Sequence, residues 1–402
     1  MQSRHRFVRT FSWLGVAALF AGCSSYGSTG KITPLDIAPG SQARLAQNAV
    51  IFDAAPVEFA YVANFGSNNI SAYAIDATSG ALKPVKGSPF AAGTGPTGLV
   101  IDPKGKFAYV PNHGSANVSA YAIDATSGAL KPVTGSPFAA GSQPYFGAVD
   151  PDGKFVYVAD NGSNSVSAYT IDATSGALNP MAGSPFATGT YPDGVAVDPK
   201  GKFAYVANDG SDNVWGYSID SASGALKPVK GSPFAAGSNP YFVTVGPSGK
   251  FAYVANNGSN NVSAYTINAT SGALKAVTGS PFVTGTQPYG VAVDPTGKFV
   301  YVPNNYSNNV SGYAINATSG ALKAVKGSPF AAGTNTDGVA VDPLGKFAYA
   351  ANDSSNNVSA YAINSTSGAL QQAKGSPFAV GTGPYLIATC RRVASTCVPP
   401  PL

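Results

Sequence analysis

A unit of 48 residues repeats seven times along this chain without a gap in register. Its marker is the tyrosine of a Phe-Ala-Tyr-Val segment, which recurs at Tyr61, Tyr109, Tyr157, Tyr205, Tyr253, Tyr301 and Tyr349. Repeats of this length that consist of short strands and turns are typical of propellers and solenoids. Because the seven units are nearly identical, we expect function at the positions where they differ.

One unit, from Thr97 to Ala140, predicts four short strands. From the innermost to the outermost, they are expected at residues 98–101, 106–110, 118–123 and 129–133. Turn sequences such as Asp102-Pro-Lys-Gly separate them, β-branched and aromatic residues recur at strand spacing, and no segment has a helical period. The sequence therefore predicts an all-β, seven-bladed β-propeller of four-stranded antiparallel blades over residues 49–397.

A ring must also join its first and last blades. The first unit begins at its second strand, with Phe59, whereas the last unit is followed by an extra copy of an innermost strand at residues 385–390. We expect this C-terminal strand to complete the first blade and remove an exposed sheet edge. The competing arrangement places Val50, Ile51 and Phe52 in that position.

The N-terminus predicts export. Arg4, Arg6 and Arg9 precede an apolar stretch at residues 11–20 that is too short to span a bilayer, as in signal peptides. Because Leu-Phe-Ala-Gly before Cys23 resembles a bacterial lipobox, we expect residues 1–22 to be removed and Cys23 to be acylated. The alternative is an ordinary signal peptide with an incidental cysteine. Residues 23–48 read as a flexible tether, and 398–402 as a tail.

Two cysteines remain after Cys23. Cys390 and Cys397 are expected to form a disulfide, since an exported protein enters an oxidising compartment. Two free thiols are the alternative.

The charge distribution argues against nucleic-acid binding. The formal net charge of +5 falls to about +2 when the three signal-peptide arginines are removed, and no basic run interleaves with aromatic residues. We expect a monomer without a cofactor, held to the membrane by its lipid anchor in the cell envelope (outer membrane, periplasm or cell surface).

The repeat resembles the blade of the 6-phosphogluconolactonase-like, or lactonase-type, seven-bladed propellers and of the related YVTN-type surface propellers. The resemblance covers residues 59–390 and rests on motifs such as Gly-Lys-Phe-Ala-Tyr-Val, Asn-Val-Ser-Ala-Tyr and Gly-Ser-Pro-Phe. It implies the propeller fold and a possible lactone hydrolase activity. No catalytic residue of the family can be transferred by motif.

Two loops of each unit are expected on one face around the axis, which is the usual binding face of a propeller. The column before the innermost strand varies from unit to unit, as Thr97, Tyr145, Asp193, Tyr241, Tyr289, Asp337 and Tyr385, and Tyr191 lies in a second variable column. The tyrosines, with Phe146 and Phe242, predict an aromatic platform for a ligand. We predict ligand binding by Tyr145, Tyr191, Asp193, Tyr241, Tyr289, Asp337 and Tyr385.

Candidate catalytic groups are few. His113 is the only histidine after the signal peptide and, with Asp193, could activate water for attack on a lactone carbonyl. A set of five aspartates is expected near the same face, namely Asp160, Asp193, Asp209, Asp337 and Asp353. Without contiguous calcium-loop spacing, solvated carboxylates are favoured over a metal site.

The first functional hypothesis is an envelope-anchored binding module for a glycan, a peptidoglycan fragment or a protein. The alternative is a lactonase that hydrolyses a sugar lactone, where a phosphorylated substrate is disfavoured because the expected face lacks Arg and Lys. A purely structural envelope protein is the third hypothesis.

Overall fold

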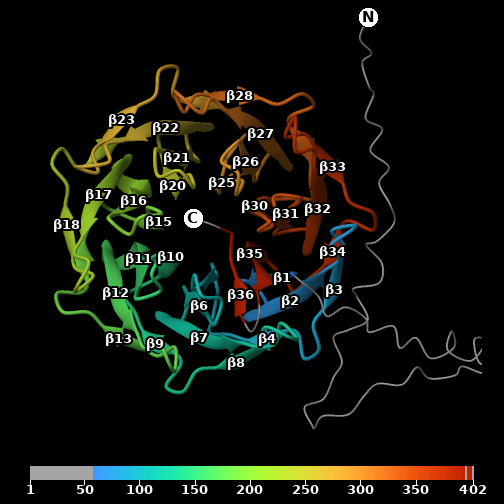
Figure 1. Ribbon diagram of the computed structural model, residues 1–402, viewed down its shortest axis with the longest axis horizontal. Coiled ribbons are helices and arrows are strands. Elements are labelled where there is room, and N and C mark those ends of the chain that lie inside the picture. Colours follow the sequence, from blue (N-terminus) through green and yellow to red (C-terminus); the bar gives the residue numbers. More distant parts are fainter. Residues whose placement is uncertain (1–57, 394–395, 401–402) are drawn as a thin grey trace, which may run out of the picture. The chain divides into compact units, whose positions relative to one another are not determined.

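The computed structural model describes residues 58–393 and 396–400, which form seven antiparallel sheets around a central axis (Figure 1). The predicted seven-bladed propeller is confirmed. Within the described residues, the helical segments are two single 3-10 turns, η2 (Asn161–Ser163) and η3 (Asp209–Ser211). No helix in this part of the chain is long and apolar enough to cross a membrane. The predicted signal peptide, Cys23, the tether and Val50–Phe52 lie outside the described residues.

Each blade has an innermost, a second and a third strand from the axis outward, and two short strands, the fourth and the fifth, pair with the third. The innermost strands are β35 (Pro384–Val393), β5 (Val100–Ile101), β10 (Pro144–Val149), β15 (Pro192–Val197), β20 (Pro240–Val245), β25 (Ala292–Val293) and β30 (Thr336–Val341). The second strands are β1 (Glu58–Asn64), β6 (Phe107–Asn112), β11 (Phe155–Asp160), β16 (Phe203–Asn208), β21 (Phe251–Asn256), β26 (Phe299–Asn304) and β31 (Phe347–Asn352). The third strands are β2 (Asn69–Ile75), β7 (Asn117–Ile123), β12 (Ser165–Ile171), β17 (Asn213–Ile219), β22 (Asn261–Ile267), β27 (Asn309–Ile315) and β32 (Asn357–Ile363).

The outer two positions hold very short strands. The fourth strands are β3 (Leu82–Pro84), β8 (Leu130–Pro132), β13 (Leu178–Pro180), β18 (Leu226–Pro228), β23 (Leu274–Ala276), β28 (Leu322–Ala324) and β33 (Leu370–Gln372). The fifth strands are β4 (Phe90–Ala91), β9 (Phe138–Ala139), β14 (Phe186–Ala187), β19 (Phe234–Ala235), β24 (Phe282–Val283), β29 (Phe330–Ala331) and β34 (Phe378–Ala379). The chain ends with β36 (Thr396–Val398), which pairs with β35.

The fifth strand is an addition to the predicted four. The Gly-Ser-Pro-Phe segment lies beyond the four predicted strands of the unit and pairs with the third strand, for example Phe138 with Val118. The serine of this segment binds the same strand, because Ser136 Oγ accepts the N–H of Ala120 at 2.9 Å. Each third strand thus has two short partners on its outer edge.

Two innermost strands are also shorter than the repeat predicts. The strand expected at residues 98–101 begins at Val100, and Pro96 forms only an isolated bridge to Asn112. The equivalent β25 begins at Ala292, and Pro288 bridges to Asn304 in the same way. In both units the second strand has a proline where the other five units have an alanine, Pro111 in β6 and Pro303 in β26, and proline has no N–H to donate to the innermost strand.

The ring closes through the C-terminal strand, as predicted. β35 lies against β1 with Phe59 opposite Cys390, so the first blade combines both ends of the described chain (Figure 1). The predicted disulfide between Cys390 and Cys397 joins β35 to β36, with the two Cα atoms 5.3 Å apart. The N–H of Cys397 donates to the carbonyl of Gly105 at 2.8 Å, which ties this hairpin to the second blade.

The marker tyrosine of the repeat holds each blade to the next. Tyr61 is fully buried, and its hydroxyl donates to the carbonyl of Gly128 at 3.0 Å, 67 residues further along the chain. The same bond recurs in every unit, and Tyr349 closes the ring by donating to Gly80 at 3.0 Å. The tyrosines of the third strands form a hydrogen bond to the preceding blade instead. The hydroxyl of Tyr121, for example, donates to the carbonyl of Ala91.

The accepting glycine cannot be replaced by a larger residue. Gly128 has a φ of +75°, and a Cβ there would lie 2.4 Å from the ring of Phe59. Only glycine combines this left-handed conformation with so close an approach. The Phe and Tyr of one second strand therefore enclose a turn of the next blade.

We predict that Tyr205→Phe destabilises the propeller by about 1–3 kcal/mol, because the buried carbonyl of Gly272 loses the donor that now lies 2.9 Å away. Urea unfolding followed by circular dichroism measures the change. Tyr306→Phe is the matched control, since this side chain is 69% exposed. Equal stability of the two variants would contradict the assigned role.

Candidate functional site

Two sets of loops lie on the same face of the propeller, as the sequence predicts. The loop before each innermost strand and the loop between the second and third strands are joined by backbone hydrogen bonds. The N–H of His113 donates to Gly95 at 2.9 Å, and that of Asp209 donates to Tyr191 at 2.8 Å. We call this side the loop face, and the opposite side, with turns such as 102–106 and 124–128, the turn face.

Tyr191 lies at the outer part of the loop face. Its φ is +50°, its side chain is 54% exposed, and its ring lies over Gly210. Its N–H donates to Asn164 Oδ1 of the preceding blade at 2.8 Å, which holds the backbone in this turn. The structure thus separates Tyr191 from the other predicted tyrosines.

Those other tyrosines converge on the propeller axis. Tyr241 and Tyr289 have ring centroids 4.5 Å apart, and Tyr145 and Tyr241 are 5.7 Å apart. The hydroxyl of Tyr385 forms hydrogen bonds with those of Tyr145, at 3.2 Å, and Tyr241. Phe146 and Phe242 pack beneath, with centroids 5.1 Å apart. We call these six residues the axial cluster.

The axial cluster is closely packed. Tyr241 is 9% exposed and Phe146 is 4% exposed. Most of the rings meet edge-to-face, as Tyr145 and Tyr241 do, whereas Phe146 and Tyr385 are stacked. The aromatic residues predicted to form a platform therefore do meet at the axis. They pack against one another in the axial cluster, and their ring faces are largely covered.

Two carboxyls lie within the same ring of positions. Asp193 is 2% exposed and Asp337 is 5% exposed, and they occupy equivalent places in units three repeats apart. Asn161 Nδ2 donates to Asp193 Oδ1 at 2.8 Å, and Asn305 Nδ2 donates to Asp337. Each asparagine belongs to the preceding blade, so each carboxyl is held across a blade interface.

Burial controls the ionisation of both carboxyls. Loss of solvation raises the pKa of Asp193 to about 8, against the weaker opposing effect of the Asn161 hydrogen bond and with a small contribution from the charge of Asp209. The pKa of Asp337 is raised to about 8 for the same reason, with Asn305 and Asp353 in the equivalent roles. These carboxyls exchange protons near neutral to mildly alkaline pH, where acid–base catalysts work best.

His113 lies beside the axial cluster. Its ring meets Tyr145 edge-on with centroids 5.3 Å apart, and Phe65 lies 6.0 Å away on the other side. Partial burial lowers the pKa of His113 below its ordinary value. The imidazole is therefore neutral at pH 7, the form that accepts a proton.

The remaining predicted carboxylates divide into two kinds. Asp209 and Asp353 are half-buried on the loop face, where burial raises their pKa. Asp160 turns into its own blade instead, contrary to expectation, because Ser167 donates to it from both its N–H, at 3.0 Å, and its Oγ, at 2.6 Å. No group of three or more His, Cys, Asp or Glu within residues 58–393 and 396–400 could hold a metal ion.

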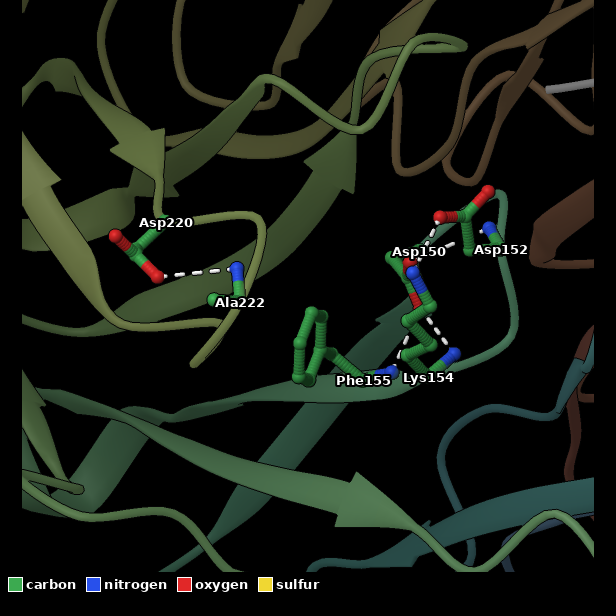
Figure 2. Close-up of polar contacts among 6 residues, drawn as sticks. All are labelled: Asp150, Asp152, Lys154, Phe155, Asp220 and Ala222. Carbon is green, nitrogen blue, oxygen red and sulfur yellow. Dashed lines mark hydrogen bonds and ion pairs between the residues drawn. The ribbon is translucent and has the colours of Figure 1, made fainter.

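Basic side chains are placed away from this site. In the described part of the chain, none of the loops of the loop face contains Lys or Arg. The lysines lie instead at the turn face and along the outer strands. Figure 2 shows one such turn, where Asp150 accepts the N–H groups of Lys154 and Phe155 at 2.6 Å.

Asn161 and Asn305 had no assigned role in the sequence, although both lie in a variable loop column. The sequence does contain a pattern that could have identified these two asparagines. An asparagine precedes an aspartate of the neighbouring unit by 32 residues in two places, 161 with 193 and 305 with 337. In one of the two intervening units Asn257 precedes Tyr289 at the same spacing, and Asn257 Nδ2 has no partner among the described residues. The spacing of 32 residues can be interpreted only once the fold is known, because it reflects pairing between side chains of neighbouring blades.

The sequence matches the model of the lactonase family, a seven-bladed β-propeller family, over residues 21–146, 147–245 and 235–337. The chain belongs to this family. Among curated proteins, no sequence matches it.

Solved structures share the fold. A candidate 6-phosphogluconolactonase from Bacteroides uniformis is 22% identical with a TM-score of 0.73, covering 83% of this chain and 99% of that one. The periplasmic gluconolactonase of Pseudomonas aeruginosa is 20% identical with a TM-score of 0.73, covering 84% and 100%. At these identities the likeness concerns the fold alone.

The buried carboxyls predict an unusual dependence of stability on pH. The carboxyl of Asp193 titrates near 3.9 in the unfolded chain and near 8 in the folded protein, so stability falls as pH rises between these values. We expect Asp193→Asn to be more stable than the parent by about 5 kcal/mol at pH 9, and equally stable at pH 4.

Urea unfolding at both pH values measures this effect. Asp124→Asn is the opposite control, because backbone hydrogen bonding by Ser127 lowers the pKa of Asp124. That variant should lose rather than gain stability at pH 9. A loss of stability in Asp193→Asn at pH 9 would show that the buried carboxyl is needed in its ionised form.

Proposed function

We propose that this propeller is a hydrolase of lactones that acts at the centre of its loop face. The observation that carries the proposal is the pair of buried carboxyls, Asp193 and Asp337, which lie near the axial cluster. Each has a pKa of about 8. Membership of the lactonase family supports the reaction class. The fold by itself would not, because propellers serve many functions.

The reaction needs three tasks from the protein. An ionised carboxylate takes a proton from water as its oxygen attacks the lactone carbonyl carbon. A tyrosine hydroxyl donates a hydrogen bond to the oxygen that becomes negative. The bond between the carbonyl carbon and the ring oxygen then breaks, and the second carboxyl, still protonated, donates to that oxygen. The products balance as one hydroxy acid from one lactone and one water.

The charge of the face supports an unphosphorylated lactone. Phosphate groups are usually bound by arginine forks or lysines, which the described loops of this face do not contain. Asp209 and Asp353 would add repulsion toward a dianion. We therefore expect glucono-δ-lactone to be a better substrate than its 6-phosphate.

We predict that Asp193→Asn and Asp337→Asn each lower kcat/KM for glucono-δ-lactone by about 10²- to 10⁴-fold. Enzyme-dependent hydrolysis, with the spontaneous rate subtracted, is expected to peak near pH 8 and to fall on either side, because one carboxyl must be ionised while the other is still protonated. A pH-stat assay follows the acid released.

Asp152→Asn serves as the control, since Asp152 is exposed in a turn on the opposite face. His113→Ala tests the other candidate base: a loss confined to this variant would move the base from the carboxyls to His113. No turnover above the spontaneous rate by folded protein would overturn the proposed hydrolase.

A binding module without catalysis is the second candidate. It is favoured by the exposure of Tyr191, at 54%, and Phe65, at 38%, on the same face, because exposed aromatic rings stack on sugars and peptides. In that case Tyr191→Ala would weaken binding in a glycan or peptidoglycan pull-down, and no lactone would be turned over.

We also propose that the protein is exported and held to a membrane through acyl chains on Cys23. The support is the basic and apolar N-terminal sequence that ends at this cysteine. In Triton X-114 partitioning of cells that express the full chain, the protein is expected in the detergent phase and Cys23→Ser in the aqueous phase. Both forms in the aqueous phase would refute the anchor.

A further inference from the structure

The propeller contains a large cavity that the proposed lactone site does not use. The central channel has a volume of about 590 Å³ and is lined by the innermost strands of all seven blades. Its upper end is closed by the axial cluster, since Phe242 lines the cavity and also packs against Phe146. The channel therefore leads toward the turn face, where Val398, Pro399 and Pro400 of the C-terminal segment also line it.

The wall of this channel is mainly apolar. Each blade contributes one residue at an equivalent position of its innermost strand to this wall, and six of the seven are Ala or Val. These residues are Val100, Ala148, Ala196, Thr244, Ala292, Ala340 and Ala388. Such small side chains leave the space open, and a cavity of this size with apolar walls is typical of a small-molecule site.

The dimensions fit an extended chain. The wall runs from Phe242, beneath the axial cluster, to Pro247 in the turn at the mouth. At about 3.3 Å per strand residue, these five steps span roughly 16 Å. An elongated apolar molecule can be held along the axis, whereas a polar one would lose its hydration against alanine and valine.

The mouth of the channel is basic. Lys104 and Lys200 directly follow the lining residues Pro103 and Pro199, and both are exposed. Further exposed lysines directly precede the second strands of six blades, at positions 106, 154, 202, 250, 298 and 346. Arg391 and Arg392 follow the lining residue Thr389 on β35, and Nη1 of Arg392 is buried without a partner among the described residues.

The acidic groups at this face are mostly engaged. Asp102 is 2% exposed and accepts the N–H groups of Lys106 and Phe107 at 2.6 Å; Asp150, Asp198, Asp294 and Asp342 have equivalent bonds. Glu58 is buried, and desolvation raises its pKa to about 7. Asp152 is exposed but pairs with Lys154 at 2.9 Å, as Figure 2 shows. Exposed carboxylates at the turn face lie in the outer turns between the third and fourth strands, at Asp76, Asp124, Asp172 and Asp220. The exposed charge next to the lining residues of the mouth is therefore positive.

An apolar channel with a positively charged mouth is complementary to an anionic amphiphile, which has an apolar chain and a negatively charged head group. We propose that the channel binds a fatty carboxylic acid, with the alkyl chain along the axis and the carboxylate at the turn face near Lys104, Lys200 and Arg391. This site is separate from the proposed lactone site, which lies above the axial cluster.

Isothermal titration calorimetry of the purified protein with dodecanoate, below its critical micelle concentration, tests the proposal. Saturable binding at one site is expected. Affinity should fall by about fourfold for each methylene removed, in decanoate and octanoate. Dodecyltrimethylammonium should bind more weakly, since the mouth repels its charge. Absence of dodecanoate binding, or equal binding of both head groups, would overturn the proposal without any variant.

Two variants locate the site. Ala292→Phe fills the channel and should abolish dodecanoate binding; Val100→Phe does the same from another blade, and thermal melts identify any variant that fails to fold. Lys104→Glu with Lys200→Glu should weaken binding about tenfold, whereas Lys131→Glu with Lys227→Glu, on the outer strands β8 and β18, should not. Unchanged binding in both channel-filling variants would place any dodecanoate elsewhere. Lactone turnover should be unaffected, which separates this test from that of the hydrolase.

Discussion

Each blade is held to the next by a buried tyrosine that recurs every 48 residues and donates its hydroxyl to a glycine carbonyl in the following blade. The bond works only because the glycine adopts a left-handed turn against the phenylalanine ring of the same second strand. An uncapped carbonyl at this depth would cost more than the bond contributes. The ring therefore needs the same three residues in every unit, and the last of these bonds, from Tyr349 to Gly80, can form only when the ring is complete.

Because the interfaces between blades are uniform, the candidate site consists of the positions at which the repeats differ. The interfaces between blades leave little freedom to the second strands, so variation is concentrated in the loops and in the innermost strands, above all at the position of Tyr145 and its equivalents. Four units place a tyrosine at that position and two place an aspartate. Because all seven positions surround one axis, these side chains meet each other, although neighbouring members lie a whole repeat apart in the chain.

The two ends of the axis have different chemistry for the same reason. At the loop face, the described residues carry carboxyl, amide and phenol groups but no Lys or Arg in the loops. At the turn face, the repeated Gly-Lys-Phe places a lysine in six blades. The axial cluster separates these two environments, with a polar and acidic site above it and an apolar channel with a basic mouth below it.

The sequence by itself determined the number of blades and the order of strands, and it favoured the closure through residues 385–390. These follow from periodicity and from matching one unit against another, which needs no knowledge of distance. It also favoured the pairing of Cys390 with Cys397, because two cysteines remain in a chain with an export signal. It also identified Asp193, Asp337 and the axial tyrosines as variable positions on one face. Only the tertiary structure decided that the tyrosines pack on each other, that Asn161 and Asn305 hold the two carboxyls, that Asp160 turns away, and that a fifth strand edges each blade. The physical reason is that burial sets ionisation and packing. How deeply a side chain such as Asp193 is covered depends on residues from other blades, which ring closure brings together.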